Sequence, residues 1–418
     1  MHMHTRHIHD RYAFAEACLN DLKARNLYRS LRTVEGPQES RVVLDNREVL
    51  VFCSNNYLGL ANHPAVRGAA LEALNRFGCG AGASRLISGT MSLHERLEHA
   101  LAEFTGYPAV LVFNSGYAAN VGILSSLMEA GDIILSDALN HASIVDGCRL
   151  SRAEVRIYRH RDVEHLEHLL KEAHGFRKRL IVTDAVFSMD GDLAPLPDLV
   201  DLAGRFGCLL MVDEARALGV LGLKGRGAAE WFGVEEKIDL SMGTLGKALG
   251  SFGAFVACSP VLREFLINRA RSFVFSTALP PPVLAAAAAA LALVENEPER
   301  RAHLLRLSRE FQEGVSRIVT MWPDTAVEDA LRTPATPIRP LILEDEIMTM
   351  EFCETLLKKG IFAQGIRPPT VPPGTARLRF SLMATHTNED VEQALGAIQE
   401  TFCELIGGKS RKGKGESA

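Results

Sequence analysis

The chain has 418 residues, of which 47% are hydrophobic and 23% charged, and its formal net charge is −5. This composition is typical of a globular protein with one large domain and a smaller one, and the acidic balance gives no support for a nucleic-acid partner. The alanine-rich apolar run at 283–294 is too short to cross a membrane, and eight cysteines without paired spacing indicate reduced thiols in the cytoplasm.

Residues 1–55 are expected to form an N-terminal segment outside the main domain. The first nine residues contain four histidines without companion ligands, so we interpret them as a disordered leader or a cloning remnant rather than a metal site. Helical spacing of apolar residues predicts a helix over 12–31, and a possible turn at 45–47 predicts a hairpin over 41–50. A second helix is expected at 64–77.

Short apolar runs alternate with amphipathic segments from residue 109 onward, and each run is expected to form a buried strand: 109–113, 133–135, 155–158, 180–186, 209–212, 238–242 and 253–257. Strands joined by helices predict an α/β fold with a mostly parallel sheet, whose ligands lie beyond the carboxyl ends of the strands. The large domain is expected over 56–290, a smaller α+β domain over 291–405 and a flexible basic tail over 406–418.

Several polar residues that follow these runs are candidates for a ligand site. Ser115 and Gly116 begin a helix whose free N–H groups favour an anion, whereas Tyr117 could contact a ligand or pack in the core. His141 by itself would more often be a capping or structural histidine. Asp213 ends a buried strand, where a carboxylate needs a cation or a donor; a helix cap or salt bridge would be its ordinary partner, and a protonated pyridine nitrogen a functional one.

Lys247 lies in the glycine-rich segment 241–250, just beyond the run at 238–242. Burial in apolar surroundings disfavours an ammonium group and lowers its pKa, which makes a lysine nucleophilic toward carbonyls. Thr244 adds a hydroxyl suited to an anionic oxygen. An imine-forming lysine that holds pyridoxal phosphate and an ordinary surface lysine are equally compatible with this segment alone.

Pyridoxal phosphate needs an imine lysine, a carboxylate for its ring nitrogen, a group against its ring, phosphate donors and a clamp for the substrate carboxylate. The chain contains candidates for all five. It also resembles the α-oxoamine synthases, within the fold-type I pyridoxal-phosphate enzymes, from about residue 22 to residue 404. The resemblance rests on these segments: 54–60 (SNNYLGL), 84–90 (SRLISGT), 113–120 (FNSGYAAN), 140–143 (NHAS), 186–191 (VFSMDG), 212–215 (VDEA), 225–227 (GRG) and 244–250 (TLGKALG).

The resemblance implies a homodimer with shared active sites, no metal, and a role for each candidate residue. Lys247 would form the imine with the cofactor and move protons at the substrate Cα, Asp213 would keep the ring nitrogen protonated, and His141 would stack on the ring. The residues implied to hold the cofactor and its phosphate are Ser115, Gly116, Tyr117, Ser188, Thr244 and, from the second subunit, Thr277. Those implied on the substrate side are Arg32, Asn55 and Arg367.

Residues 365–379 and 384–386 are similar to the 8-amino-7-oxononanoate synthases of biotin synthesis. Because a bidentate arginine is a natural partner of a carboxylate, Arg379 is the preferred clamp for the amino acid, with surface ion pairs as the ordinary alternative. Prolines on both sides hold Thr370 in a stiff, extended segment. The implied reaction condenses L-alanine with pimeloyl-CoA, or with the pimeloyl thioester of a carrier protein, and releases carbon dioxide and CoA.

Arg216 departs from the family pattern, which usually has a histidine that donates to the cofactor's phenolic oxygen. An arginine can donate to the same oxygen, but its permanent charge would favour the phenolate and perturb the pKa of the imine. Two alternatives therefore remain. One is a sister synthase that uses glycine or serine with another acyl-CoA, such as 2-amino-3-ketobutyrate CoA ligase, and the other is a non-catalytic subunit that keeps the fold.

Overall fold

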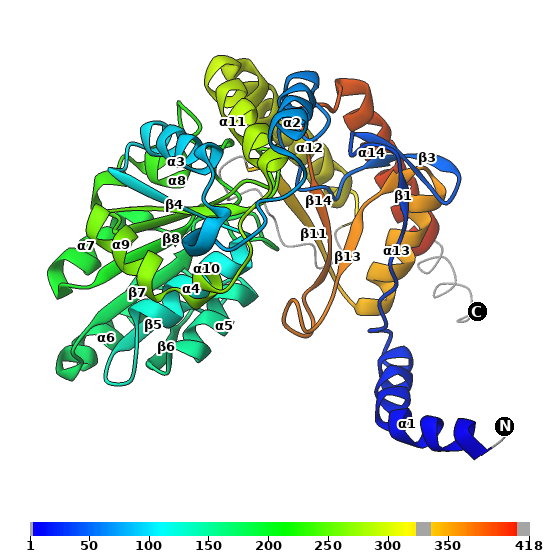
Figure 1. The fold of residues 1–418 in the computed structure, drawn as a ribbon. Helices are drawn as coiled ribbons and strands as arrows, with labels where there is room; N and C mark the ends of the chain where they lie inside the picture. The colour runs from blue at the N-terminus through cyan, green and yellow to red at the C-terminus, as the bar shows by residue number, and fades with distance from the viewer. Residues whose placement is uncertain (1–2, 323–335, 408–418) are drawn as a thin grey trace, which may run out of the picture.

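The computed structural model describes residues 3–322 and 336–407, and the tail expected at 406–418 lies outside these ranges from residue 408 onward. Figure 1 shows a larger body built on one sheet beside a smaller body formed mainly by the C-terminal part of the chain. Helix α1 (Met3–Ala24) projects away from both bodies.

The large sheet contains all the predicted strands, each within two residues of its expected bounds: β4 (Ala109–Phe113), β5 (Ile133–Asp137), β6 (Glu154–Tyr158), β7 (Arg179–Asp184), β8 (Leu209–Asp213), β9 (Leu240–Thr244) and β10 (Ala254–Cys258). Their spatial order is β4-β10-β9-β8-β7-β5-β6. Strand β10 runs antiparallel to β4 and β9, whereas the pairs from β9 to β6 are parallel. The predicted mostly parallel sheet is confirmed.

Helices cover both faces of this sheet, because neighbouring residues of each strand point to opposite cores. Val110 and Val112 belong to one apolar core, and Leu111 and Phe113 to the other. The helices of this body are α2 (Pro64–Phe77), α3 (Ser92–Thr105), α4 (Gly116–Leu127), α5 (Ala142–Ser151), α6 (Val163–Glu172), α7 (Leu196–Phe206), α8 (Ala228–Phe232), α9 (Pro260–Arg269), α10 (Arg271–Val274) and α11 (Pro281–Asn296). Short turns of other helix types lie at Arg85–Gly89, Ala173–Gly175 and Glu235–Lys237.

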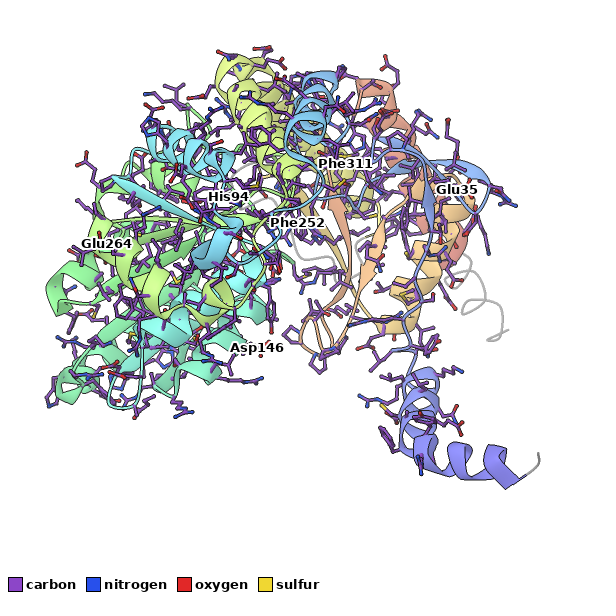
Figure 2. All side chains as sticks on the ribbon, in the orientation of Figure 1. Glu35, His94, Asp146, Phe252, Glu264 and Phe311 are labelled. Carbon is purple, nitrogen blue, oxygen red and sulfur yellow. The ribbon has the colours of Figure 1, made fainter. Side chains whose placement is uncertain are left out.

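The smaller body combines both ends of the chain. Its elements are β1 (Val34–Glu35), β2 (Arg41–Leu44), β3 (Arg47–Val51), α12 (Pro298–Thr320), β11 (Ile338–Glu344), α13 (Glu346–Lys358), β12 (Ile361–Phe362), β13 (Gln364–Ile366), β14 (Ala376–Ser381), α14 (Asn388–Phe402) and a last helical turn at Cys403–Gly407. Strand β3 pairs in parallel with β12, so the N-terminal hairpin joins the C-terminal part. Phe311 of α12, which is labelled in Figure 2, stacks on Phe52 at 5.6 Å and packs against Phe380 at 5.2 Å.

The N-terminal helix differs from its prediction at both ends. Residues 3–9, which we expected in a disordered leader, belong to α1, because no glycine or proline interrupts the segment from Met3 to Ala24. The predicted helix over 12–31 ends early, since Asn26 adopts a left-handed backbone with φ of 55°. The predicted hairpin is confirmed; its turn residues Asp45 and Asn46 also have positive φ, which these residue types tolerate.

The described residues include neither a membrane-spanning helix nor a metal-binding cluster. Within residues 3–322 and 336–407, no helix combines the length and the apolar character needed to span a membrane. In the same part of the chain, no group of histidine, cysteine and carboxylate side chains is arranged to hold a metal ion.

Candidate active site

A cavity of about 390 Å³ lies at the carboxyl ends of β7, β8 and β9, where the sequence placed the ligand site. The residues that line it are Asn55, Ser115, Gly116, Tyr117, Asn120, His141, Asp184, Val186, Asp213, Ala215, Arg216, Met242, Thr244, Gly246, Lys247, Ser251, Phe252 and Gly253. The cavity therefore brings together nine of the predicted site residues from five separate segments of the chain.

The N-terminus of α4 forms one wall of this cavity. Ser115 is the N-cap residue, and its Oγ accepts a hydrogen bond from the Ala118 N–H at 3.1 Å. A Cβ atom on Gly116 would lie 2.8 Å from Thr244 Cγ2, so glycine lets the helix begin close to β9. Thr244 donates its hydroxyl to the Ala215 carbonyl at 3.2 Å. The remaining free N–H groups of the first turn make this wall suitable for an anion.

Asp213 is buried at the end of β8 with 5% of its surface exposed. Its carboxylate accepts hydrogen bonds from Asn120 Nδ2 at 2.8 Å and from the Ala215 N–H at 2.9 Å. Asn120 lies on α4 and also donates to Ser143 Oγ at 2.9 Å, so its side chain fixes the carboxylate between two helices. A fixed, buried carboxylate can stabilise a cationic ring nitrogen.

Asp184 is the neighbour of Asp213 across the β7–β8 pair. Burial, and next the Asp213 carboxylate, raise the pKa of Asp184 well above its usual range. Asp184 Oδ2 accepts the backbone N–H of His141 at 3.0 Å, which ties the loop after β5 to the end of β7.

His141 and Tyr117 take up positions at the mouth of the cavity. His141 is the N-cap residue of α5, and its Nδ1 lies 2.7 Å from Ser143 Oγ. The pKa of His141 is lowered, chiefly by burial, so the ring is mainly neutral at pH 7. Tyr117 is half exposed and donates its hydroxyl to Asp146 Oδ2 at 2.6 Å.

Lys247 lies in the loop that connects β9 to β10. Burial and, next, the Arg216 guanidinium together lower the pKa of Lys247 to about 8, against the opposing effect of the Asp213 and Asp184 carboxylates. The loop closes tightly at Gly250, which has a φ of 59° and where a Cβ atom would lie 2.3 Å from the Ala61 backbone nitrogen. A lysine held in this way keeps a reactive, neutral amine near physiological pH.

Three distant segments meet at Asn55, on the side of the small body. Arg216 Nη1 donates to the Tyr57 hydroxyl at 2.6 Å and to Asn55 Oδ1 at 3.1 Å, and Arg379 Nη2 donates to the same Asn55 oxygen at 3.1 Å. Arg379 is buried on β14, and its Nε has no hydrogen-bond partner within the described chain. An unpaired N–H on a buried guanidinium can donate a hydrogen bond to a substrate carboxylate.

Six of the predicted site residues do not line this cavity: Arg379, which lies beside Asn55, and five that lie elsewhere. Ser188 is buried in the loop after β7, and Thr277 is exposed with its carbonyl bonded to Asn114 Nδ2 at 2.7 Å; neither lines the cavity in this chain. Arg32, Arg367 and Thr370 line a second cavity, of about 810 Å³, between the N-terminal segment and the small body.

The second cavity is rich in cationic side chains. Arg367 donates to the Tyr28 carbonyl at 2.8 Å, and Arg29 donates to Thr370 Oγ1 at 3.1 Å. Arg32 makes a long contact with Asp45, 3.9 Å from nitrogen to oxygen. Sequence reasoning did not single out Arg29, whose approach to Thr370 joins residues 341 positions apart.

Sequence reasoning also missed the roles of Asn120 and Tyr57. Both lie in segments that carry the family resemblance, and a buried amide in a helix next to a glycine-rich turn was the available signal. Asp184 was visible as a carboxylate inside an apolar run, but its contact with His141 depends on tertiary pairing.

The cavity fits pyridoxal phosphate in chemical terms. The N-terminus of α4 suits a phosphate, Asp213 suits a protonated ring nitrogen, and Lys247 offers a primary amine for the aldehyde. Asn120 Oδ1 in the cavity wall and Arg379 Nε beside Asn55 are buried polar atoms without a partner in the described residues, so each can pair with a group of a ligand.

Comparison with known proteins assigns the chain to a family. Residues 47–398 match the family model of class I and II aminotransferases. The 8-amino-7-oxononanoate synthase of Geobacter sulfurreducens is 56% identical over 392 residues, which cover 93% of this chain and 97% of that protein. The 8-amino-7-oxononanoate synthase of Citrifermentans bemidjiense is 53% identical over 389 residues, with 93% and 97% covered.

A solved structure of similar fold holds the cofactor. A variant of serine palmitoyltransferase from S. paucimobilis, with bound pyridoxal phosphate joined to myriocin, superposes with a TM-score of 0.88 at 31% identity and covers 95% of this chain and 98% of its own. Together with the cavity around Lys247, this makes the chain a pyridoxal-phosphate enzyme of fold type I. More narrowly, the chain belongs to the class I and II aminotransferase family, in the branch of the α-oxoamine synthases.

Proposed function

We propose that this chain condenses L-alanine with pimeloyl-CoA, or with the pimeloyl thioester of a carrier protein, to give 8-amino-7-oxononanoate, CoA and carbon dioxide in biotin biosynthesis. The observation that carries the proposal is the cavity that joins Lys247, Asp213 and His141 in a chain 56% identical to a named 8-amino-7-oxononanoate synthase. The same relatives and the fold support a synthase in preference to an aminotransferase.

The residues of the cavity divide the work of binding the cofactor. Pyridoxal phosphate, when bound, supplies a ring that accepts the electrons of a carbanion at the amino-acid Cα. Lys247 would hold the cofactor through its amine and would hold or move the proton at Cα. Asp213 keeps the ring nitrogen protonated, His141 covers the ring, and the N-terminus of α4 with Thr244 holds the phosphate. Tyr117 and Ser188 are proposed to support the cofactor.

Arg216 replaces the usual histidine near the phenolic oxygen of the cofactor. Its guanidinium is held by Tyr57 and Asn55, so one nitrogen is already committed and the others can donate to that oxygen. This arrangement supports a catalytic Arg216 and weakens the alternative of a non-catalytic subunit.

The substrate groups are proposed to bind on the side of the small body. Arg379, with its unpaired Nε, receives the carboxylate of L-alanine, and Asn55 orients that guanidinium. The second cavity, with Arg32, Arg367 and Thr370, receives the acyl donor, because its cations suit the free carboxylate of the pimeloyl chain or the phosphates of CoA.

We further propose a cytoplasmic homodimer with shared sites, in which Thr277 of each chain contacts the phosphate held by the other. Thr277 is exposed and lies outside the cavity of its own chain, which supports a role toward a second copy.

The sister synthase that joins glycine or serine to another acyl-CoA is the second candidate, because glycine and serine carry the same carboxylate that Arg379 would bind.

The test is a CoA-release assay on the protein loaded with pyridoxal phosphate. Pimeloyl-CoA is offered with L-alanine, glycine or L-serine, and acetyl-CoA with glycine serves as the comparison for the sister reaction. We expect release with pimeloyl-CoA and L-alanine. Faster release with acetyl-CoA and glycine would assign the sister reaction, and a loaded protein that releases CoA from no pair would contradict both.

A further inference from the structure

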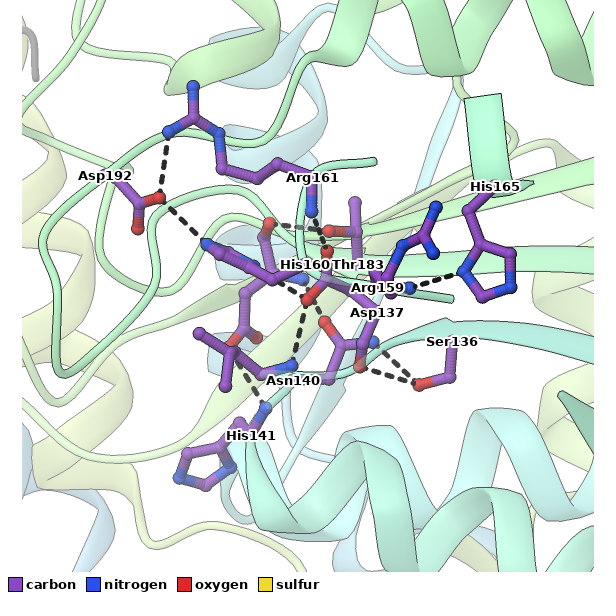
Figure 3. Close-up of polar contacts among 12 residues, drawn as sticks. Ser136, Asp137, Asn140, His141, Arg159, His160, Arg161, His165, Thr183 and Asp192 are labelled. Atoms are coloured by element: carbon purple, nitrogen blue, oxygen red, sulfur yellow. Dashed lines mark hydrogen bonds and ion pairs between the residues drawn. The ribbon is translucent and has the colours of Figure 1, made fainter. Parts of the chain in front are cut away.

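A buried ion cluster lies beside the cavity and has no part in the proposed chemistry (Figure 3). The imidazole of His160, which follows β6, lies between two carboxylates: Nδ1 is 2.9 Å from Asp137 Oδ1, and Nε2 is 2.9 Å from Asp192 Oδ2. Asp137 ends β5, and Asp192 lies in the loop after β7. The ring also meets Phe187 edge to face at 4.4 Å. His160 therefore links the ends of three neighbouring strands.

The cluster requires a charged ring. A neutral imidazole carries one N–H, so only the imidazolium can donate to both carboxylates at once. Burial opposes that charge, but the hydrogen bonds to Asp137 and Asp192 outweigh it and raise the pKa of His160 to about 9. The side chains of Asp137 and Asp192 are only 1% and 8% exposed, so loss of the His160 proton leaves both buried carboxylates without the neighbouring cation and one of them without its hydrogen bond from the ring.

One end of the cluster holds the loop that carries His141. Asp137 accepts the Leu139 N–H through Oδ1 and the Arg161 N–H through Oδ2, both at 2.9 Å. Further along this loop, Asn140 bonds to the β7 backbone, and the His141 N–H donates to Asp184. The loop over 137–141 is therefore held at its start by Asp137 and at its end by Asn140 and the His141 N–H, and these contacts fix the position of His141.

The other end of the cluster reaches the small body. The backbone N–H of Phe187 donates to the Asp192 carbonyl at 3.0 Å, which closes the loop over 187–192. Within it, Asp190 forms an ion pair with Arg377, and the Gly191 carbonyl accepts the hydroxyl of Thr336 at 2.8 Å. Arg377 lies on β14, two residues before Arg379.

We propose that His160 is a positioning residue: as an imidazolium shared by Asp137 and Asp192, it fixes the loop of His141 to the loop that contacts the strand of Arg379. The ring-covering histidine and the carboxylate clamp then keep one mutual position through the reaction. The inference rests on the proposed function of these two residues. The charged groups around the ring are Asp137, Asp192 and Arg161, whose Nη1 lies 3.0 Å from Asp192 Oδ2.

The test compares His160→Gln with His165→Gln, both fully loaded with pyridoxal phosphate. His165 is a matched control, because it is a partly buried histidine five residues further along, in the first turn of α6, and accepts the Arg159 N–H at 3.0 Å without contacting Asp137 or Asp192. We expect His160→Gln to reduce the visible circular dichroism of the bound cofactor, to lower kcat by about tenfold to a hundredfold and to raise KM for L-alanine. His165→Gln should match the parent protein in all three.

Asp192→Asn provides an independent arm, since it keeps the hydrogen-bonding shape and removes one charge. Asp192→Asn should change the circular dichroism and kcat less than His160→Gln does. The double variant with His160→Gln should change both by less than the sum of the two single effects. Unchanged circular dichroism and kcat in His160→Gln, or in Asp192→Asn if the first variant does not fold, would overturn the inference. The dichroism needs no turnover, so it still decides if the parent protein proves inactive with L-alanine and pimeloyl-CoA.

Discussion

At the scale of the residue, charge in a poorly solvated cavity governs the chemistry. Because the pKa of Lys247 is lowered to about 8, about a tenth of the amine is neutral at pH 7, against less than about a thousandth for an exposed lysine. Burial is the largest cause, and Arg216 is the next. The residue that departs from the family pattern therefore also activates the lysine.

Replacing Arg216 with glutamine should move the reactivity of Lys247 to higher pH. Loss of the neighbouring cation raises the pKa of the lysine, and below that pKa the rate of cofactor attachment changes about tenfold per pH unit. The rate is measured by absorbance after mixing apoprotein with pyridoxal phosphate between pH 6.5 and 9.5. Arg216→Lys keeps the charge and should keep the parent midpoint, near pH 8. A midpoint that stays the same or falls in Arg216→Gln would contradict this account.

At the scale of the element, the N-terminus of α4 has to approach β9 closely. Ser115 Oγ accepts the Ala118 N–H, and the backbone N–H groups of the first turn, whose placement depends on Gly116, remain available for the anion that we propose binds here. A side chain at that position would displace the helix from Thr244. The sequence signal here is a serine followed by glycine after a buried strand.

The variant Gly116→Ala should bind pyridoxal phosphate about tenfold more weakly, or ~1.4 kcal/mol. The added methyl group would lie 2.8 Å from Thr244 Cγ2, so helix or strand has to shift. Equilibrium dialysis measures the affinity. Gly204→Ala in α7 is the matched control, because a methyl group there meets nothing within 4 Å; it should leave the affinity unchanged and stabilise the fold by up to ~1 kcal/mol. Equal affinities for both variants would contradict a phosphate role for this helix.

At the scale of the whole molecule, the cavity lies where the large sheet faces the small body. Asn55 and Arg379 come from segments more than 300 residues apart and meet through one hydrogen bond, and Asp190 and Arg377 form a second link. The relative placement of the two bodies therefore sets the distance between the cavity around Lys247 and Arg379, the residue that we propose as the clamp for the amino acid.

Mixing two defective variants tests whether sites are shared between subunits. Lys247→Ala and Thr277→Glu should each be nearly inactive as homodimers, the second because its carboxylate repels the phosphate. In mixed dimers, one site combines the intact Lys247 of one chain with the intact Thr277 of the other, so about a quarter of the parent activity should return after random exchange. If Thr277 served its own chain, no mixed site would be complete and no activity would return.

Much of the large body was predictable, because its signals are local. Apolar runs marked the strands to within two residues, and the polar residues at their ends lie in one cavity, as parallel topology requires. The end of the N-terminal helix was predicted wrongly. The apolar spacing continues to residue 31, but the helix stops at Ala24, just before Asn26 adopts a left-handed backbone. The resemblance assigned Ser188 to the cofactor and Arg32 and Arg367 to the substrate; Ser188 does not line the cofactor cavity, and the two arginines line the second cavity.

The sequence by itself determined the order of strands and helices, the lysine, the carboxylate and the glycine-rich turns, because each depends on residues close together along the chain. Tertiary structure alone decided that Arg216 and Arg379 share Asn55, that Arg29 reaches Thr370, and that His160 lies between Asp137 and Asp192. These contacts join segments 23 to 341 residues apart, and their geometry depends on sheet register and on the packing of the two bodies, which no local pattern records.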